Sequence, residues 1–245
     1  MVDIFGWLSE LMAQILKAFY SLMPSYGWGI IFLTLLMRLV LFPISISQVR
    51  SMEKMKAIQP KLKEIQDKYK DKPEELQRRM METYRENKVN PLGGCFPLLL
   101  QMPFFFALIG LLNNPANYDI NLAKEIFFGI PLTQVGKWAT VFGASLGNLI
   151  LALLSAATTY LQQKVMSPAP TTGGTAEGAG SMQTTFLYIV PLFFGYITFT
   201  MAAAIGVYWV ALNVIGIVQQ ILIVRFFMPP AAPAGEGGGQ TRRKP

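Results

Sequence analysis

The sequence predicts an all-α, polytopic membrane protein with five transmembrane helices, a cytoplasmic helical hairpin and an N-terminal interfacial helix. Of its 245 residues, 52% are hydrophobic and only 14% are charged, against about 25% charged residues in soluble domains. Most charges fall between residues 50 and 88, and long apolar runs flank this segment. Several of these runs approach or exceed about 20 residues, the length with which a helix crosses a bilayer.

Residues 1–25 are predicted to form an amphipathic helix at the membrane interface. Apolar residues recur every three or four positions in this segment, which is typical of one helical face. Asp3, Glu10 and Lys17 interrupt the pattern, and these charges disfavour full insertion. The segment lacks the basic start and small-residue cleavage site of a secretory signal, so we expect no cleaved presequence.

The first predicted span, residues 26–49, carries a single arginine at the centre of an apolar run from Trp28 to Gln48. Arg38 lies about 15 Å from either end of this run, near the midplane of the bilayer. An arginine there costs about 2.5 to 3.5 kcal/mol on insertion scales, and no Asp or Glu lies in another apolar run. We therefore predict a hydrated, positively charged cavity. The alternative is a structural arginine that snorkels or pairs with a carbonyl.

Residues 50–92 are predicted to form the helical hairpin. From Arg50 to Lys88 there are 12 Lys or Arg and 8 Asp or Glu residues. Apolar residues step by three or four on both sides of a break at 71–73, so each arm has a narrow apolar seam. The alternative is a solvated charged loop with helical propensity. The seam residues are Met52, Met55, Ile58, Leu62, Ile65 and Tyr69, then Leu76, Met80 and Tyr84.

Residues 93–113 form the second predicted span, which contains Gln101 and two prolines. Prolines in membrane helices more often mark kinks than chemistry. An external loop is expected over 114–137 and a third span over 138–163. Polar residues of the third span fall at helical spacings and share a face. They are Asn148, Ser155, Thr159 and Gln162.

The remainder of the chain contains two low-complexity segments and one long apolar segment. Residues 164–182 and 229–245 have too little apolar surface to fold, so they are predicted to be a flexible cytoplasmic linker and a disordered basic tail. Residues 183–228 are about twice as long as one span requires. We expect a fourth and a fifth span there, with a turn near Ile205 and Gly206. One polar stripe of the fifth comprises Trp209, Asn213 and Gln220.

Charge predicts the orientation of the spans. The hairpin and the tail hold 12 and 4 of the 21 basic residues when Arg225 is counted with the tail. Cytoplasmic loops carry such an excess, so we expect a multi-pass protein of the bacterial plasma (inner) membrane with an external N-terminus and a cytoplasmic C-terminus. Anionic lipid and ribosomal RNA both remain open as partners of these basic segments.

Several chemistries are excluded by composition. The chain has no histidine and one cysteine, which rules out histidine-dependent catalysis, cysteine-based zinc sites and an intrachain disulfide. It has no phosphate-binding loop of the G-x-x-x-x-G-K-[ST] type and no pair of intramembrane carboxylates. We therefore expect neither enzymatic turnover nor a cofactor or metal site.

Four features resemble the YidC/Oxa1/Alb3 membrane protein insertase family. They are the arginine-bearing first span, the charged hairpin, the second-span sequence NPLGGCFPLLLQMPFFFAL and the last-span sequence GVYWVALNVIGIVQQ. The five-span core resembles the compact, Gram-positive-type members. These are usually lipoproteins with a cleaved signal, and neither feature is visible here. The resemblance implies a protein that inserts newly made membrane proteins and assists their folding, alone or beside the Sec translocon.

The resemblance also implies a hydrophilic groove, open to the cytoplasm and to lipid, in which Arg38 attracts acidic residues of a client's external segment. Gln101 and Trp209 match groove-lining positions of the family, whereas Thr34 belongs to the groove by helix geometry, four residues before Arg38. The full predicted groove comprises Arg38, Thr34, Gln101, Asn148, Trp209, Asn213 and Gln220. The hairpin is the family's client-recruiting element, here with Met52, Met55, Leu62, Tyr69, Arg78 and Arg79.

The implied partners are nascent membrane proteins with acidic external segments, the lipid bilayer, the Sec translocon and the ribosome, with no small-molecule substrate. Two other functions are compatible with the sequence. One is a small anion channel whose filter includes Arg38, although no internal repeat supports it. The other is a structural subunit or chaperone of another membrane complex.

Overall fold

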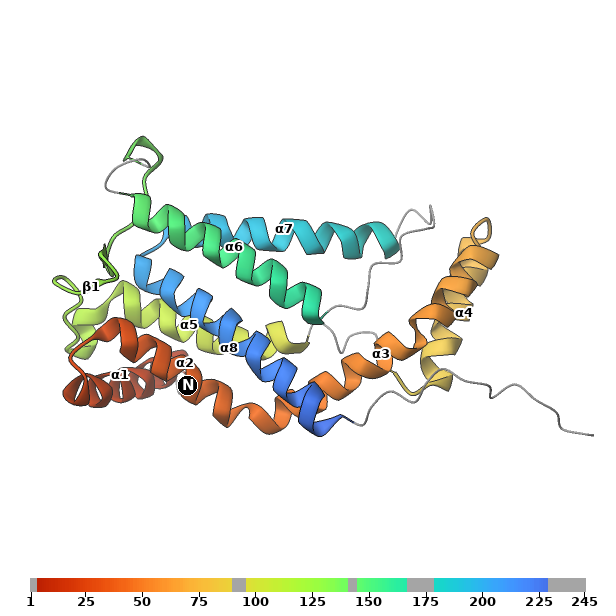
Figure 1. Cartoon of the computed structure of the whole chain (residues 1–245), viewed down its shortest axis with the longest axis horizontal. Helices are drawn as coiled ribbons and strands as arrows, with labels where there is room; N and C mark the ends of the chain where they lie inside the picture. The colour runs from red at the N-terminus through yellow and green to blue at the C-terminus, as the bar shows by residue number, and fades with distance from the viewer. Residues whose placement is uncertain (1–3, 90–95, 141–144, 167–178, 229–245) are drawn as a thin grey trace, which may run out of the picture.

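The computed structural model describes residues 4–89, 96–140, 145–166 and 179–228. These parts of the chain contain eight α-helices, two short 3-10 helices and one two-stranded sheet. In Figure 1 the sheet lies at one end of the molecule and α4 at the other, with a helical bundle between them. The bundle consists of α2 (Tyr26–Val40), α5 (Phe96–Asn113), α6 (Leu146–Met166), α7 (Ala179–Thr200) and α8 (Ala203–Phe227).

Helix α8 lies at the centre of this bundle and packs against α2, α5, α6 and α7. Every residue from Ala203 to Trp209 is buried, so the first two turns of α8 are enclosed on all sides. A helix that is apolar all round is suited to this position, because no face has to be kept in water. Its buried polar residues, Asn213, Gln219 and Gln220, therefore face other helices.

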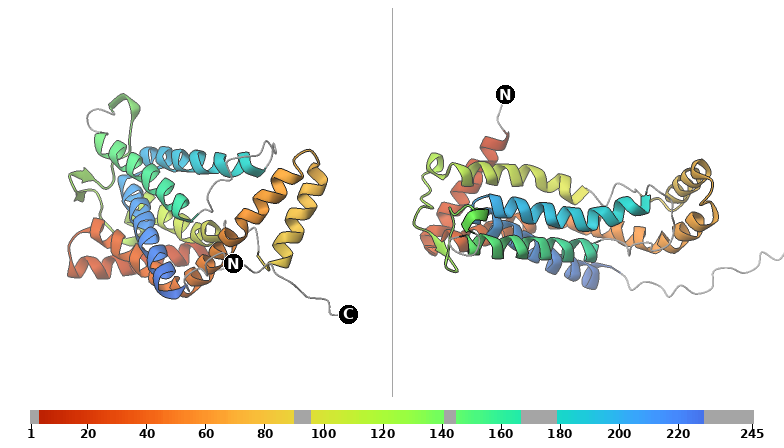
Figure 2. Two further views of the ribbon diagram at one scale, coloured as in Figure 1. Left: turned by 45° about the vertical axis from the view of Figure 1, so that its right-hand side comes forward. Right: turned by 90° about the horizontal axis from the view of Figure 1, so that it is seen from above.

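Helix α1 (Ile4–Leu22) packs on α5 and α2 and lies at a steep angle to the bundle helices (Figure 2). Met12, Ala13 and Leu16 are buried on the inner face, while Trp7 on the outer face is 61% exposed. The Ser9 hydroxyl bonds to the carbonyl oxygen of Ala107 on α5 at 2.8 Å. A place at the membrane interface remains a prediction for this helix.

The first predicted span is not one straight helix. Helix α2 ends at Val40, and α3 (Phe42–Lys68) follows after a bend of 67°. Pro43 explains the break, because its ring clashes with the carbonyl of Leu39 in a continuous helix and it donates no hydrogen bond. The predicted span limit at residue 49 therefore falls inside α3 and not at a helix end, and the limit of the span remains a prediction.

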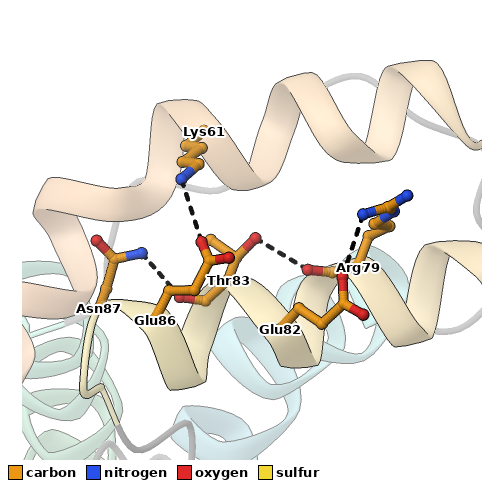
Figure 3. Close-up of polar contacts among 6 residues, drawn as sticks. All are labelled: Lys61, Arg79, Glu82, Thr83, Glu86 and Asn87. Carbon is orange, nitrogen blue, oxygen red and sulfur yellow. Dashed lines mark hydrogen bonds and ion pairs between the residues drawn. The ribbon is translucent and has the colours of Figure 1, made fainter.

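Helix α4 (Pro73–Glu86) folds back along α3 (Figure 3). Ile58, Leu62 and Val89 form a small apolar core between the two helices, with Met55 and Tyr84 packed against it. Lys61 of α3 pairs with Glu86 of α4 at 3.6 Å. These contacts are those expected of a two-helix hairpin, and its cytoplasmic location remains a prediction.

The segment between α5 and α6 forms more structure than a plain loop. It contains η2 (Pro115–Tyr118), β1 (Ile126–Phe127), β2 (Ile130–Pro131) and η3 (Trp138–Thr140). Strands β1 and β2 pair antiparallel, and both turn residues have positive φ, 47° at Phe128 and 78° at Gly129. Positive φ at both positions is the signature of a type I′ hairpin turn.

The predicted start of the third span at residue 138 is wrong, because α6 begins at Leu146. Trp138 lies in η3, and its ring packs against Phe199 with centroids 4.3 Å apart. The Ser145 hydroxyl accepts a hydrogen bond from the backbone N–H of Lys137 at 3.0 Å. Such side-chain bonds to the backbone compete with helix formation and favour a helix start at this position.

The predicted turn near Ile205 and Gly206 is also wrong, because α7 ends at Thr200 and α8 begins at Ala203. The N–H groups of Ala203 and Ala204 donate to the carbonyls of Gln134 at 2.8 Å and Leu132 at 2.9 Å. The first N–H groups of a helix need such partners from outside it. The segment after β2 supplies them and so sets where α8 starts.

By length and hydropathy, α8 is long and apolar enough to cross a membrane, and α2 and α3 pass the same test as a bent pair. Among the described residues, α5 and α7 contribute shorter apolar segments, Leu100–Asn113 and Leu187–Thr200. The count of five spans therefore remains a prediction.

The predicted linker 164–182 is helical at both of its described ends, 164–166 and 179–182. The middle of this linker lies outside the described residues, as does the predicted tail 229–245.

Candidate functional site

Arg38 of α2 lies against the middle of α8. Its Nη2 atom donates a hydrogen bond to the carbonyl oxygen of Leu212 at 3.0 Å. Its Nε atom is buried and has no hydrogen-bond partner among the described residues, although the residue as a whole is only partly buried. The bond to Leu212 is the pairing with a carbonyl that the structural alternative expects, but a guanidinium carries five N–H donors and this bond uses one of them.

Gly216 makes this close approach to α8 possible. A Cβ at Gly216 would lie 2.7 Å from Nη2 of Arg38 and 2.5 Å from the side-chain nitrogen of Gln162. Both distances are shorter than atoms tolerate, so a larger residue would displace one or both groups. Glycine at this position therefore seats Arg38 of α2 and Gln162 of α6 on the same turn of α8.

No carboxylate neutralises Arg38 within the part of the chain that the structure describes. One ion pair there joins α3 to α4, Lys61–Glu86, and the others lie within α3, within or just before α4, or join Lys17 to Asp119. None includes Arg38. A partly buried cation without a counter-charge is costly unless water or an anion solvates it. The site is therefore electrostatically suited to an acidic ligand.

Two further buried donors near these helices lack partners within the described part of the chain. They are the side-chain nitrogens of Gln48 on α3 and Gln220 on α8. Gln220 follows Gly216 by four residues, so it lies one turn further along the same face of α8. The neighbouring Gln219 donates to the backbone oxygen of Arg38 at 3.3 Å. Gln220 thus leaves one buried amide donor without a partner in the described chain on this side of α8.

Trp209 and Asn213 form a second polar cluster, between α8 and α6. The hydroxyl oxygen of Thr159 accepts from Nε1 of Trp209 at 3.0 Å and from the amide of Asn213 at 2.8 Å. The Trp209 ring is also stacked on Phe194, with centroids 3.9 Å apart. All three hydrogen-bonded side chains are buried, so this cluster joins two helices and does not line an open surface.

The other predicted groove residues have separate roles in the structure. The amide of Gln101 donates to the hydroxyl of Tyr208 at 2.6 Å, which joins α5 to α8. Thr34 is buried on the Arg38 side of α2, but its hydroxyl donates to the Ile30 carbonyl of its own helix at 2.6 Å. Asn148 lies apart from Arg38, because its amide donates to the carbonyls of Gln134 at 2.9 Å and Met201 at 3.3 Å.

The hairpin residues are engaged within α3 and α4. Met52 and Leu62 are buried, and Met55 packs against the small core that contains Leu62. Tyr69 lies 5.9 Å from the Arg79 guanidinium, measured from its ring centroid. Arg79 also pairs with Glu82 at 3.3 Å (Figure 3). Arg78 pairs with Glu75 at 3.8 Å. Part of the predicted apolar seam thus packs between the two helices, namely Met55, Ile58, Leu62, Met80 and Tyr84. The role of the hairpin in recruiting clients remains a prediction.

Sequence reasoning did not identify Gly216 or the Leu212 carbonyl as part of the Arg38 surroundings. Glycine is common in apolar spans, so the presence of Gly216 in one does not indicate a role in the site. Helix periodicity does carry one, because Leu212, Gly216 and Gln220 recur at intervals of four. Gln162 was recognised as part of the polar face of α6 but not as a neighbour of Arg38.

Comparison with known proteins decides the family. Residues 18–230 match the family described as 60Kd inner membrane protein, which is the YidC/Oxa1 family. The chain belongs to this family. The resemblance predicted from the second-span and last-span sequences is therefore confirmed.

Relatives in the YidC/Oxa1 family carry the description membrane protein insertase YidC. That of Endomicrobium trichonymphae is 32% identical over 221 residues, which cover 90% of this chain and 40% of the relative. That of Wolinella succinogenes is 37% identical over 204 residues, which cover 83% of this chain and 34% of the relative. The chain thus spans well under half the length of these YidC relatives.

A solved structure shares the fold. It is described as an active YidC insertase with its first transmembrane domain resolved, and it matches with a TM-score of 0.62 at 21% identity. The match covers 87% of this chain and 45% of that one. The likeness supports the helical YidC fold described above.

Proposed function

We propose that this chain is a membrane protein insertase that inserts newly made membrane proteins and assists their folding. The observation that carries the proposal is Arg38, a partly buried cation seated against α8 with no carboxylate partner in the described chain. A client's acidic external segment supplies the missing negative charge. The names of the YidC relatives support the same function.

The mechanism has no chemical step. Arg38 and neighbouring donors such as Gln220 attract the acidic segment partway into a hydrated region of the membrane. This shortens the distance over which polar groups must cross hydrocarbon. The client's own apolar helix then partitions into lipid, and its burial supplies the driving force.

The proposed topology has five spans, with the N-terminus outside and the C-terminus in the cytoplasm. In it, α2 with the start of α3 forms the first span, and α5, α6, α7 and α8 form the others. The hairpin and the basic tail then share the cytoplasmic side, in agreement with their excess of Lys and Arg. The β1–β2 turn lies on the opposite, external side.

The hairpin of α3 and α4 is proposed to recruit clients on the cytoplasmic side. Its buried seam keeps the two helices together, while exposed Met81 offers an apolar contact and Arg78 an electrostatic one. The Sec translocon and the ribosome are proposed as partners that deliver clients. The proposed location is the bacterial inner membrane.

Insertion into vesicles tests the proposal. Purified chain is reconstituted in liposomes, and a single-span client with an acidic external tail is scored by protease protection. We expect Arg38→Ala to lower insertion by about tenfold, equivalent to about 1.4 kcal/mol. Arg38→Lys should retain most of it, because the charge is kept.

Arg225→Ala is the matched control, since it removes an exposed arginine near the end of α8, the helix against which Arg38 of α2 lies. Its insertion activity should equal that of the unaltered chain. Full activity of Arg38→Ala with the acidic client would refute the proposed role of Arg38. Anion flux through the vesicles without any client would instead favour a channel.

A further inference from the structure

The turn between β1 and β2 has an unusual residue at its tip. Phe128 adopts a φ of 47°, and its side chain is 80% exposed. Type I′ turns prefer Asn, Asp or Gly at this position, because a Cβ is unfavourable in the left-handed region. An exposed phenylalanine therefore has an unfavourable backbone and gains little burial within the chain.

The residues around this tip are apolar as well. The sequence from Ile126 to Pro131 reads IFFGIP, and Ile126 is 64% exposed. Trp28 of α2 is 46% exposed and lies beside the tip, with its ring centroid 6.2 Å from that of Phe128. Phe128 and Trp28 thus form one exposed aromatic patch, here called the aromatic tip, and Ile126 is a further exposed apolar residue two positions before Phe128 in the chain.

The aromatic tip is fixed to the start of α2. The ring of Phe127 covers Gly27 so closely that a Cβ there would overlap it. Glu125, the residue before β1, accepts a hydrogen bond from the N–H of Tyr26 at 3.3 Å and another from the hydroxyl of Tyr20 at 3.2 Å. These contacts make the tip an extension of α2, so a force on one is transmitted to the other.

The aromatic tip also continues an apolar stripe along α2. Four large side chains on one face of this helix are 40% to 58% exposed, at spacings of four, three and four residues. They are Trp28, Phe32, Leu35 and Leu39. In the proposed topology this face meets acyl chains. Trp28 ends the stripe at the external side, where Phe128 adjoins it, and Trp and Tyr are the residues enriched at membrane interfaces.

We propose that the aromatic tip inserts into the external leaflet at the boundary between headgroups and acyl chains, and thereby fixes the depth of α2. Ten residues separate Trp28 from Arg38, which is about 15 Å along a helix. This equals half of a hydrocarbon core about 30 Å thick. Anchoring the tip at the boundary holds Arg38 at the midplane. The inference rests on the membrane location that the proposed function requires.

Photo-crosslinking to lipid tests the proposal. Benzoylphenylalanine is placed at position 128, 192 or 117 of the full chain, reconstituted in vesicles of radiolabelled phosphatidylethanolamine and phosphatidylglycerol. Leu192 is 69% exposed on α7 and serves as the lipid-facing reference, while Asn117 is an exposed polar residue of η2. We expect lipid adducts at position 128 in similar yield to position 192 and about tenfold above position 117.

Each other outcome overturns the inference in a distinct way. Strong lipid labelling at position 192, with labelling at position 128 no higher than at position 117, would agree with the membrane location and refute the anchor. Labelling at neither 192 nor 128 would refute the membrane location and the proposed function together. Protein adducts in place of lipid adducts at position 128 would show that a second polypeptide covers the tip.

Phe128→Asn provides a second measurement that does not depend on the probe. Asparagine tolerates positive φ, so the purified variant should unfold in detergent at the same temperature as the unaltered chain or at a higher one. In vesicles, benzoylphenylalanine placed at position 126 of the Phe128→Asn variant should give lipid adducts in a yield no higher than at position 117. A variant that loses thermal stability in detergent and keeps lipid labelling at 126 would contradict the anchor.

Discussion

The Nη2 atom of Arg38 lies 2.7 Å from the point at which a Cβ on Gly216 would stand. The guanidinium therefore rests directly on the backbone of α8, and this contact lets it reach the carbonyl oxygen of Leu212 one turn earlier. Arg38 of α2 supplies the charge of the site. The position of this charge depends on Gly216 of α8, which has no side chain. Changing Gly216 should move the charge without removing it.

Gly216→Val is expected to displace Arg38 and to lower insertion of clients with acidic tails. The added side chain occupies the space of Nη2, so the bond to Leu212 is lost. We expect at least about a tenfold loss with the acidic client, or about 1.4 kcal/mol, and a smaller loss with a client whose tail is neutral. The ratio of the two insertion yields is the measurement.

Val214→Leu is the control for this change, since Val214 is 45% exposed on the same helix. It should leave both yields unchanged. If Gly216→Val reduced both clients equally, general damage to helix packing would explain the loss, and the proposed seat for Arg38 would be wrong.

Thr159→Val is expected to destabilise the contact between α6 and α8. Thr159 accepts from both Trp209 and Asn213, so its replacement by an isosteric residue leaves two buried donors without their shared acceptor. The expected cost is about 1 to 2 kcal/mol. Thermal unfolding in detergent measures it. Thr158→Val should cost less, because Thr158 receives a bond from Asn213 alone.

The sequence predicted those parts of the site that follow from periodicity along one helix. Arg38 stands out because a charge in an apolar run has a known cost. The polar face of α6 was found because Ser155 and Thr159 recur at helical spacing, and both are buried in the structure. The YidC/Oxa1 family was recognised from the second-span and last-span sequences.

Other features depend on contacts between distant segments, which periodicity does not reveal. The start of α8 is set by carbonyls of Leu132 and Gln134, about 70 residues earlier in the chain. Asn148 was grouped with the groove because it shares a face with Ser155, but seven residues along a helix separate positions by about 10 Å. A shared face therefore does not place two side chains in one site.

Asn148→Leu tests this separation of roles. Asn148 links α6 to the segment after β2 and to the end of α7 through Gln134 and Met201. Loss of these bonds is expected to lower the unfolding temperature in detergent, at a cost of about 1 kcal/mol. The ratio of insertion yields for acidic and neutral clients should stay constant. A change in that ratio would show that Asn148 contributes to the client groove.

Glu125→Gln is expected to lower the pKa of Tyr20. The carboxylate of Glu125 lies beside the Tyr20 hydroxyl, and its negative charge disfavours the tyrosinate, which raises the pKa of Tyr20 above its usual value of 10.0. Because this pKa is higher in the folded state, the stabilising contact is fully present below pH 10 or so and is lost as the pH rises through the folded value. Ultraviolet titration of tyrosinate against a Tyr20→Phe reference measures the shift.

Asp119→Asn is the control for this change, because it alters another acidic residue of the same loop, paired with Lys17 at 3.9 Å. It should leave the Tyr20 titration unchanged. An unaltered titration in Glu125→Gln would mean that Glu125 does not fasten the aromatic tip to α1 and α2.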